Sequence, residues 1–243
     1  MVLEYSFGSD SVYPELQPGV LRLYSNRVCP FAKRTRLVLE HKNIPYEIVN
    51  INLADKPKWY IEKVSCLGMV PAIQHDDVIV FDSVIVNEYL DAVFPKNKLI
   101  PDDPYAAAKT KMFAEIWSRV LRGTGRIFSC SPGTEGNVFP DLLASLDDIE
   151  NELRLKDTPF FGGQTPMMID FHMWPHMERI VHYSQLFEEC KLEDSRFHHL
   201  NGWVKRITSL PAVIKTKTPL DLFQLFYKSL KAGKIDYDIG LSR

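Results

Sequence analysis

Short apolar runs and helical runs alternate over the first hundred residues of the chain. Short runs typical of strands cover residues 20–24, 46–51, 72–74 and 78–81, and the second of them is rich in β-branched residues. Helices are predicted over residues 31–42, which have helical apolar spacing, over 57–63, which a proline opens, and over 84–93. Asp76-Asp77 predicts a turn that joins the last two strands as a hairpin, and Ser83 predicts an N-cap for the third helix. The opening strand–helix–strand order predicts parallel strands joined by a right-handed crossover.

The remainder of the chain has helical spacing almost throughout. The predicted helices cover residues 105–128, 141–156, 169–184, 196–207 and 219–230. Three prolines between residues 95 and 104 mark a linker. We therefore predict an irregular N-terminal extension, a small α/β domain, a linker and an all-α domain. Their bounds are 1–19, 20–94, 95–104 and 105–243.

Composition narrows the classes of function. Of the 243 residues, 45% are hydrophobic and 25% are charged, with a formal net charge of -2. The positive charges are scattered, so neither nucleic acid nor a membrane surface is an expected partner. No apolar run approaches the roughly 20 residues of a membrane helix. Residues 1–6 lack the basic start and apolar core of a secretory signal, and we expect a cytoplasmic protein.

The four cysteines are far apart and form no CxxC pair, which excludes a usual zinc-finger spacing and argues against a disulfide framework. Cys29 stands between a predicted strand and a helix that opens with Pro30. A helix N-terminus carries partial positive charge and favours the reactive thiolate. The alternative for Cys29 is a buried structural thiol. Basic residues close in sequence strengthen the reactive interpretation; they are Arg27, Lys33 and Arg34.

Cys29-Pro30-Phe31-Ala32 looks like the glutaredoxin motif with its second cysteine replaced. Ala32 cannot resolve a mixed disulfide formed on Cys29. A centre with one thiol needs an external thiol to complete its turnover, and glutathione is the obvious cellular candidate.

Several motifs together carry a family resemblance. They are residues 22–25, Arg27, 29–32, 34–39, 50–53, 56–57, 68–71, 99–105, 160–163, 169–170, 174–175 and 178–179. In this combination the chain resembles the omega class of cytosolic glutathione transferases, from about Val20 to its end. The resemblance implies a thioredoxin-like N-terminal domain, an all-α helical C-terminal domain and a homodimer.

The resemblance also implies the roles of individual residues. The cysteine that matches Cys29 forms a mixed disulfide with glutathione. The positions that match the glutathione-binding pattern are Phe31, Lys56, Val70, Pro71, Asp82 and Ser83. Lys56 suits the glycyl carboxylate, Ser83 at a helix start suits the γ-glutamyl carboxylate, and Asp82 suits the γ-glutamyl ammonium. The family usually has Glu where this chain has Asp82.

By the same resemblance, Pro71 follows a cis peptide bond that exposes the Val70 backbone to the cysteinyl part of glutathione. The second substrate is expected near Cys29, in an acceptor pocket formed by Pro30, Arg179, Leu220, Phe223 and Tyr227. Leu220 replaces a Trp common in the family. For Phe223 and Tyr227, the alternative is helix packing at i, i+4 spacing.

The implied activities are glutathione-dependent thiol transfer and dehydroascorbate reduction, with weaker conjugation of glutathione to electrophiles. A hydroxyl of Tyr24 or Ser25 could in principle activate glutathione for conjugation. The rival hypotheses are a redox protein like the chloride intracellular channels and a non-catalytic binding protein on the same fold. We predict no metal: His172 and His176 have i, i+4 spacing, but Met173 stands where a zinc protease has Glu.

Two further positions depart from the family pattern. Cys66 replaces a usual Pro next to residues 68–71, and it is either a resolving thiol for Cys29 or a spare loop residue. Met167 replaces a Ser that caps a core helix, which leaves Asp170 as the candidate anchor of that turn.

Overall fold

The computed structural model describes residues 5–241, so the first four residues of the predicted extension and the last two of the chain lie outside the described residues. The chain forms two compact units. One contains the described residues up to Asn97 together with those from Lys215 onward, and the other is Lys98–Ile214. The predicted all-α domain, 105–243, is therefore divided, and its last part belongs to the first unit. Hydrogen bonds explain this: Lys33 Nζ donates to Thr218 Oγ1 and Arg27 Nη1 to the Ile239 carbonyl.

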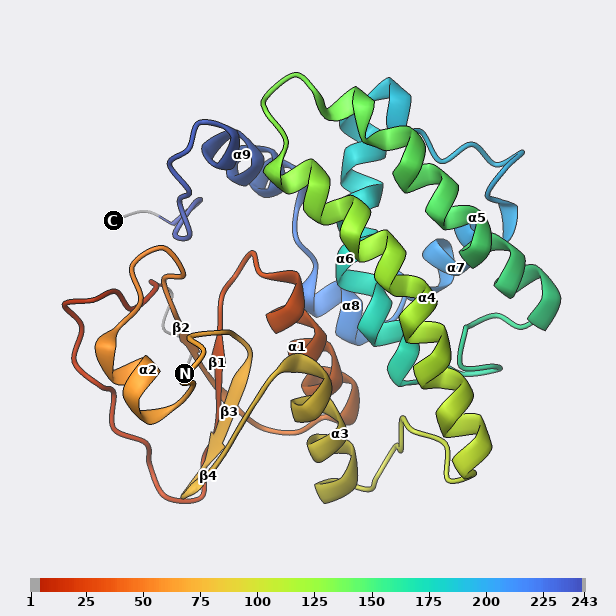
Figure 1. The fold of residues 1–243 in the computed structure, drawn as a ribbon. Coiled ribbons are helices and arrows are strands. Elements are labelled where there is room, and N and C mark those ends of the chain that lie inside the picture. The colour runs from red at the N-terminus through yellow and green to blue at the C-terminus, as the bar shows by residue number, and fades with distance from the viewer. Residues whose placement is uncertain (1–4, 242–243) are drawn as a thin grey trace. The chain divides into compact units, whose positions relative to one another are not determined.

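The first unit is built on a four-stranded mixed sheet (Figure 1). Its strands are β1 (Leu21–Ser25), β2 (Glu47–Asn50), β3 (Ala72–His75) and β4 (Val78–Phe81). Their order is β2-β1-β3-β4; β1 and β2 are parallel, and β3 is antiparallel to both β1 and β4. The helices are α1 (Pro30–Lys42), α2 (Lys58–Lys63) and α3 (Ser83–Val93). Helices α1 and α3 lie side by side on one face of the sheet, and α2 lies on the other (Figure 1). The predicted thioredoxin-like order is confirmed.

Local chemistry explains these bounds. Pro30 occupies the first turn of α1, where its missing N–H costs no hydrogen bond, and Asn43 ends the helix in the left-handed conformation with φ 54°. Asp76 has φ 52° in the turn between β3 and β4, a conformation that Asp tolerates better than most residues. The predicted hairpin is therefore present.

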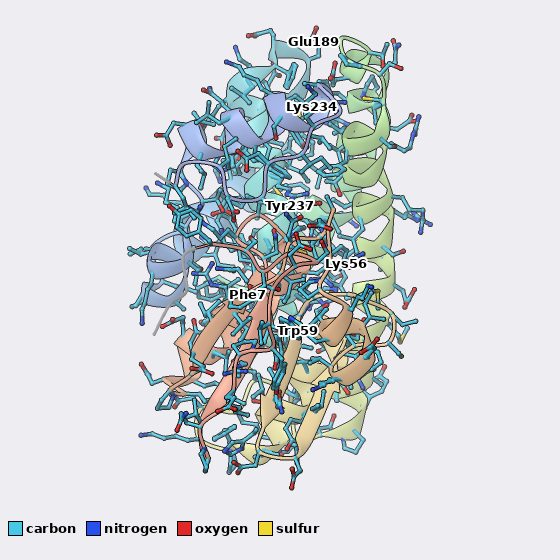
Figure 2. All side chains as sticks on the ribbon, turned by 90° about the vertical axis from the view of Figure 1, so that its left-hand side faces the viewer. Phe7, Lys56, Trp59, Glu189, Lys234 and Tyr237 are labelled. Carbon is cyan, nitrogen blue, oxygen red and sulfur yellow. The ribbon has the colours of Figure 1, made fainter. Side chains whose placement is uncertain are left out.

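The described part of the N-terminal extension is not wholly irregular. Phe7 pairs in parallel with Ile51, next to β2: its N–H donates to the Asn50 carbonyl at 2.8 Å and its carbonyl accepts from Asn52 at 2.9 Å. The Phe7 and Trp59 rings, labelled in Figure 2, meet edge to face with centroids 6.0 Å apart. This pairing is non-local, so the hydrophobic pattern of the extension alone could not predict it.

The second unit is helical. Its long elements are α4 (Pro104–Ser129), α5 (Phe139–Lys156), α6 (Met168–Leu186) and α7 (His198–Ile207), with two short 3₁₀ turns at Glu135–Asn137 and Glu188–Cys190. Helix α8 (Pro211–Thr216) contains the boundary between the units, and α9 (Leu220–Lys231) lies in the first. The long helices match their predicted ranges to within two residues, and α6 continues through Pro175. No helix within residues 5–241 has the length and apolarity to cross a membrane.

Asp170 anchors the start of α6, as its position suggested. Met167 is the N-cap residue. The buried Asp170 carboxylate accepts hydrogen bonds from four donors: the backbone N–H groups of Phe161 (2.9 Å), Gly162 (3.1 Å) and Met167 (2.9 Å), and the Trp203 indole Nε1 (2.8 Å). One carboxylate thus joins α6, α7 and the loop before α6.

Candidate functional site

Cys29 is the N-cap residue of α1, and its side chain makes no capping hydrogen bond. The loop before it is held by the buried Asn26, whose Nδ2 donates to the Ile51 carbonyl at 3.0 Å and whose Oδ1 accepts from Val28 N–H at 3.1 Å. Cys29 is partly exposed. Its sulfur therefore stands at a rigid strand-to-helix turn, next to the positive end of the α1 dipole.

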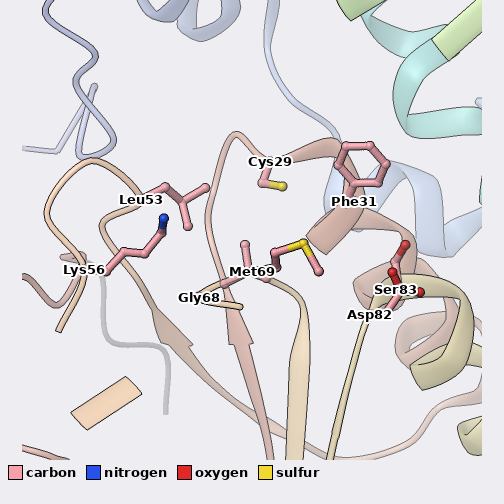
Figure 3. A pocket seen from close by; sticks show the side chains of 9 residues that line it. Cys29, Phe31, Leu53, Lys56, Gly68, Met69, Asp82 and Ser83 are labelled. Atoms are coloured by element: carbon pink, nitrogen blue, oxygen red, sulfur yellow. The ribbon is translucent and has the colours of Figure 1, made fainter. Parts of the chain in front are cut away.

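A cavity of about 310 Å³ opens beside Cys29, entirely within the first unit (Figure 3). It is lined by Cys29, Phe31, Leu53, Lys56, Gly68, Met69, Val70, Asp82 and Ser83. The structure thus brings Cys29 together with five residues predicted from the glutathione-binding pattern. Leu53, Gly68 and Met69 belong to motifs of the resemblance but had no predicted role, because their lining positions depend on how three loops converge.

The polar groups of the cavity lie at opposite ends. Lys56 lies at one end, Asp82 and Ser83 at the other, and Cys29 is between them (Figure 3). Gly68 has φ +61°, and a Cβ there would meet Lys56 Cδ at 3.1 Å, so glycine lets the lysine stem pass close to the loop. A cationic end, a thiol and a helix N-terminus in one cavity suit an extended molecule with carboxylates at its two ends.

The loop before β3 also lines the cavity. The Val70–Pro71 peptide bond is cis, as the resemblance implied, and Val70 lines the cavity whereas Pro71 does not. Tyr60 Oη donates to the Met69 carbonyl at 2.6 Å, and Ser65 Oγ accepts from Met69 N–H at 3.2 Å. These bonds fix the loop against α2.

The start of α3 differs from the prediction. Asp82, not Ser83, is the N-cap residue: its Oδ1 accepts from Val84 N–H at 2.8 Å and Ile85 N–H at 3.4 Å. Ser83 is the first helical residue and lines the cavity. Both residue types are good caps and they are adjacent, so the pattern could not distinguish them. Asp82 has φ 78°, a backbone conformation that is costly for a residue other than glycine.

The two hydroxyls considered for activating glutathione lie elsewhere. Tyr24 is buried, and its hydroxyl donates to Gln74 Oε1 at 2.6 Å. Burial raises the pKa of the Tyr24 phenol, which opposes ionisation. Ser25 is fully buried, and neither residue lines the cavity. The geometry gives these hydroxyls no role in the site.

The predicted acceptor residues do not line this cavity. Pro30 is buried at the start of α1. Phe223 and Tyr227 are buried in α9, with stacked rings whose centroids are 6.2 Å apart, and Leu220 begins that helix. Arg179 belongs to the second unit, where its guanidinium lies 5.5 Å from the centroid of the Phe128 ring. The acceptor pocket stays a prediction.

The other cysteines show no comparable setting. None of the four cysteines forms a disulfide, and Cys66 is exposed. Burial, with a smaller contribution from the Glu189 charge, raises the pKa of the Cys190 thiol to about 12, which keeps it protonated at neutral pH. Among the described residues, no cluster of three His, Cys, Asp or Glu side chains could hold a metal ion.

Comparisons with known proteins point to one family. The glutathione S-transferase N-terminal domain family matches residues 23–98. Pyrimidodiazepine synthase of Drosophila melanogaster is 36% identical over 92% of this chain and 91% of its own. Rat glutathione S-transferase omega-2 is 37% identical over 92% of this chain and 89% of its own. The human omega-2 protein is 36% identical over 86% and 84% respectively.

Solved structures show the same fold. The tau-class glutathione S-transferase of mango has a TM-score of 0.79 at 21% identity, over 88% of this chain and all of its own. Glutathione transferase Omega 3C of Trametes versicolor has a TM-score of 0.72 at 21% identity, covering 84% of this chain and 91% of its own. With the fold, the cavity beside Cys29 and relatives that match over most of their length, the chain belongs to the omega class of glutathione transferases.

Proposed function

We propose that this protein is a glutathione-dependent thiol transferase and dehydroascorbate reductase whose nucleophile is Cys29. The observation that carries the proposal is the cavity in which Cys29, at the N-terminus of α1, lies between Lys56 and the start of α3. A cysteine thiolate exchanges disulfides directly, whereas a Tyr or Ser hydroxyl serves to activate glutathione for conjugation. Conjugation to electrophiles is accordingly the weaker activity.

Glutathione has charged groups at both ends and its thiol in the middle, as the cavity requires. Lys56 pairs with the glycyl carboxylate, and the Val70 backbone binds the cysteinyl part like a strand edge. Ser83 and the α3 N-terminus bind the γ-glutamyl carboxylate. Asp82 binds the ammonium through Oδ2, because Oδ1 already accepts two backbone hydrogen bonds. Phe31 packs against the peptide from the side.

The chemistry balances without a metal. The Cys29 thiolate attacks the glutathionyl sulfur of a mixed disulfide, forms a bond to it and releases the other thiolate, which takes a proton. A second glutathione attacks the resulting Cys29–glutathione disulfide, releases Cys29 and leaves as glutathione disulfide. With dehydroascorbate, two glutathione molecules supply two electrons and two protons, and the products are ascorbate and glutathione disulfide.

A dehydroascorbate reductase assay on wild type and Cys29→Ala tests the proposal. We expect the variant to lose at least a hundredfold in rate, because no other described thiol lines the cavity. Equal rates in the two proteins would reject the mechanism. Chloride efflux from liposomes tests the channel-like rival, and an intact fold without glutathione-dependent turnover would favour a non-catalytic binding protein.

The acceptor is chosen by residues outside the cavity. We propose that Pro30, Leu220, Phe223 and Tyr227, all in the first unit, line the acceptor pocket, as the family pattern implies. A relative at 36% identity bears the name pyrimidodiazepine synthase, so similarity alone does not select the acceptor. The variant Leu220→Trp restores the residue common in the family. It should change KM for dehydroascorbate while leaving KM for glutathione unchanged, and the opposite pattern would remove Leu220 from the pocket.

We further propose a cytoplasmic homodimer. A reducing glutathione pool, which the cytosol supplies, is needed to return Cys29 to its thiol form. Apolar side chains are exposed on β4 and the start of α3; they are Val78, Ile79, Val84 and Ile85. Exposed apolar residues on two neighbouring elements favour an interface between two copies. Light scattering should report a dimer for the wild type and a monomer for Ile85→Glu, and a monomeric wild type would contradict this.

A further inference from the structure

A buried guanidinium lies behind the cavity. Arg34, in the second turn of α1, is only 2% exposed, which is rare for an arginine that is not held by specific partners. Its Nη1 donates to Ser83 Oγ at 3.2 Å, and its Cζ lies 4.8 Å from the centroid of the Phe31 ring. Ser83 and Phe31 both line the cavity, so Arg34 contacts two of the cavity-lining residues without lining the cavity itself.

Helices α1 and α3 are joined by a series of buried polar contacts. In order along both helices, these contacts are Arg34–Ser83, Thr35 Oγ1–Asn87 Oδ1 at 2.8 Å and Lys42 Nζ–Asp91 Oδ1 at 2.6 Å. Both helices begin at the cavity, because Cys29 is the N-cap residue of α1, Asp82 is the N-cap residue of α3, and both line the cavity (Figure 3). The Arg34 contact therefore joins the thiol end of α1 to the start of α3.

Arg34 also interacts electrostatically with Cys29 and Asp82. Burial lowers the pKa of its guanidinium, and the charges of Cys29 and Asp82 oppose that effect. Since such coupling is mutual, the guanidinium favours the thiolate of Cys29. Other titratable groups near Cys29 include the Tyr60 phenol on α2, and Lys56 and Asp82 line the same cavity.

We propose that Arg34 is a positioning residue of the glutathione site, which orients the Ser83 hydroxyl and favours the thiolate of Cys29. Because Nη1 donates to Oγ, the proton of the hydroxyl is left to be donated into the cavity, where a carboxylate can accept it. The identity of that carboxylate, the γ-glutamyl group, rests on the proposed function. The effect on Cys29 does not, because it is present in the protein without glutathione.

The test compares Arg34→Met and Arg34→Lys with Thr35→Val, a matched variant that removes the neighbouring contact between the same two helices. The first readout is the pH dependence of iodoacetamide alkylation at Cys29, followed by peptide mapping. Arg34→Met should move the midpoint upward by about one pH unit and slow alkylation at pH 6 about tenfold, the effect of removing one nearby opposite charge. Arg34→Lys should restore most of this rate, and Thr35→Val should match wild type.

The second readout is KM for glutathione in the dehydroascorbate assay. Arg34→Met and Arg34→Lys should both raise KM about tenfold, the loss of one charge-assisted hydrogen bond, because lysine cannot hold both Ser83 and Phe31. In a Ser83→Ala background, Arg34→Lys should have no further effect on KM. Arg34→Met and Arg34→Lys profiles that match Thr35→Val in both readouts would overturn the proposal. An inactive wild type would reject the proposed function, and the alkylation profile would still decide the role of Arg34.

Discussion

The stability of the second unit depends on one carboxylate, and Asp170→Asn should expose that dependence. Asp170 is fully buried, and each of its oxygens accepts two hydrogen bonds: Oδ1 from Phe161 N–H and the Trp203 indole, Oδ2 from Gly162 and Met167 N–H. Asparagine keeps the shape but replaces one oxygen with an NH₂ donor. Whichever way the amide turns, two buried N–H groups lose their acceptor.

Each buried donor without an acceptor costs about 1–3 kcal/mol, so Asp170→Asn should lower the free energy of unfolding by about 2–6 kcal/mol. That is a large share of the about 5–15 kcal/mol that holds a typical domain together. Urea denaturation followed by intrinsic fluorescence measures the change. Asp141→Asn is the control, because its ion pair with Arg126 is exposed and worth about 1 kcal/mol or less. Equal losses in the two variants would refute the anchoring role.

Three further predictions concern pH, packing and thiol reactivity. Burial, assisted by the Lys42 charge, lowers the pKa of His41, so the folded state binds fewer protons near pH 6 than the unfolded state does. The free energy of unfolding should therefore fall as pH drops below about 6.5. In urea titrations, His41→Gln should flatten that pH dependence. A slope that His41→Gln leaves unchanged would contradict this. A Cβ on Gly162 would overlap the Met167 side chain, so Gly162→Ala should lower the melting temperature and cost about 1–3 kcal/mol. Gly125→Ala, whose Cβ would meet no atom within 4 Å, should not. Iodoacetamide at pH 7 should modify Cys29 and the exposed Cys66 well before the buried Cys190, as peptide mapping would show; early modification of Cys190 would reject its buried, protonated state.

Much of the fold follows from the sequence because most elements have one apolar face and recognisable ends. Pro30 and Asn43 delimit α1 by backbone chemistry, and the long helices of the second unit show clear periodicity. Helix α8 was not predicted, although it is as long as α2, which was. The pairing of Phe7 beside β2 and the grouping of α9 with the first unit depend on contacts between residues far apart in sequence. Local patterns do not contain that information.

Part of the candidate site could be predicted from the sequence and part could not. Cys29 is marked by its place between a strand and a helix, and the resemblance identifies Lys56, Val70 and Ser83, which line the cavity with it. Arg34 could be recognised from the sequence as a charge close to Cys29, but its burial could not, because arginine is usually exposed. The four donors around Asp170 could likewise not be predicted from the sequence, since they come from three separate segments.

The central claim is that Cys29 carries the glutathionyl group during turnover. Peptide mapping by mass spectrometry, after rapid acid quenching of the enzyme with glutathione disulfide, tests it most directly. The account predicts one glutathionyl group on the peptide that contains Cys29, its removal by added glutathione, and no adduct at that site in Cys29→Ala. An adduct found only on Cys66, or turnover with an unmodified Cys29 peptide, would contradict it.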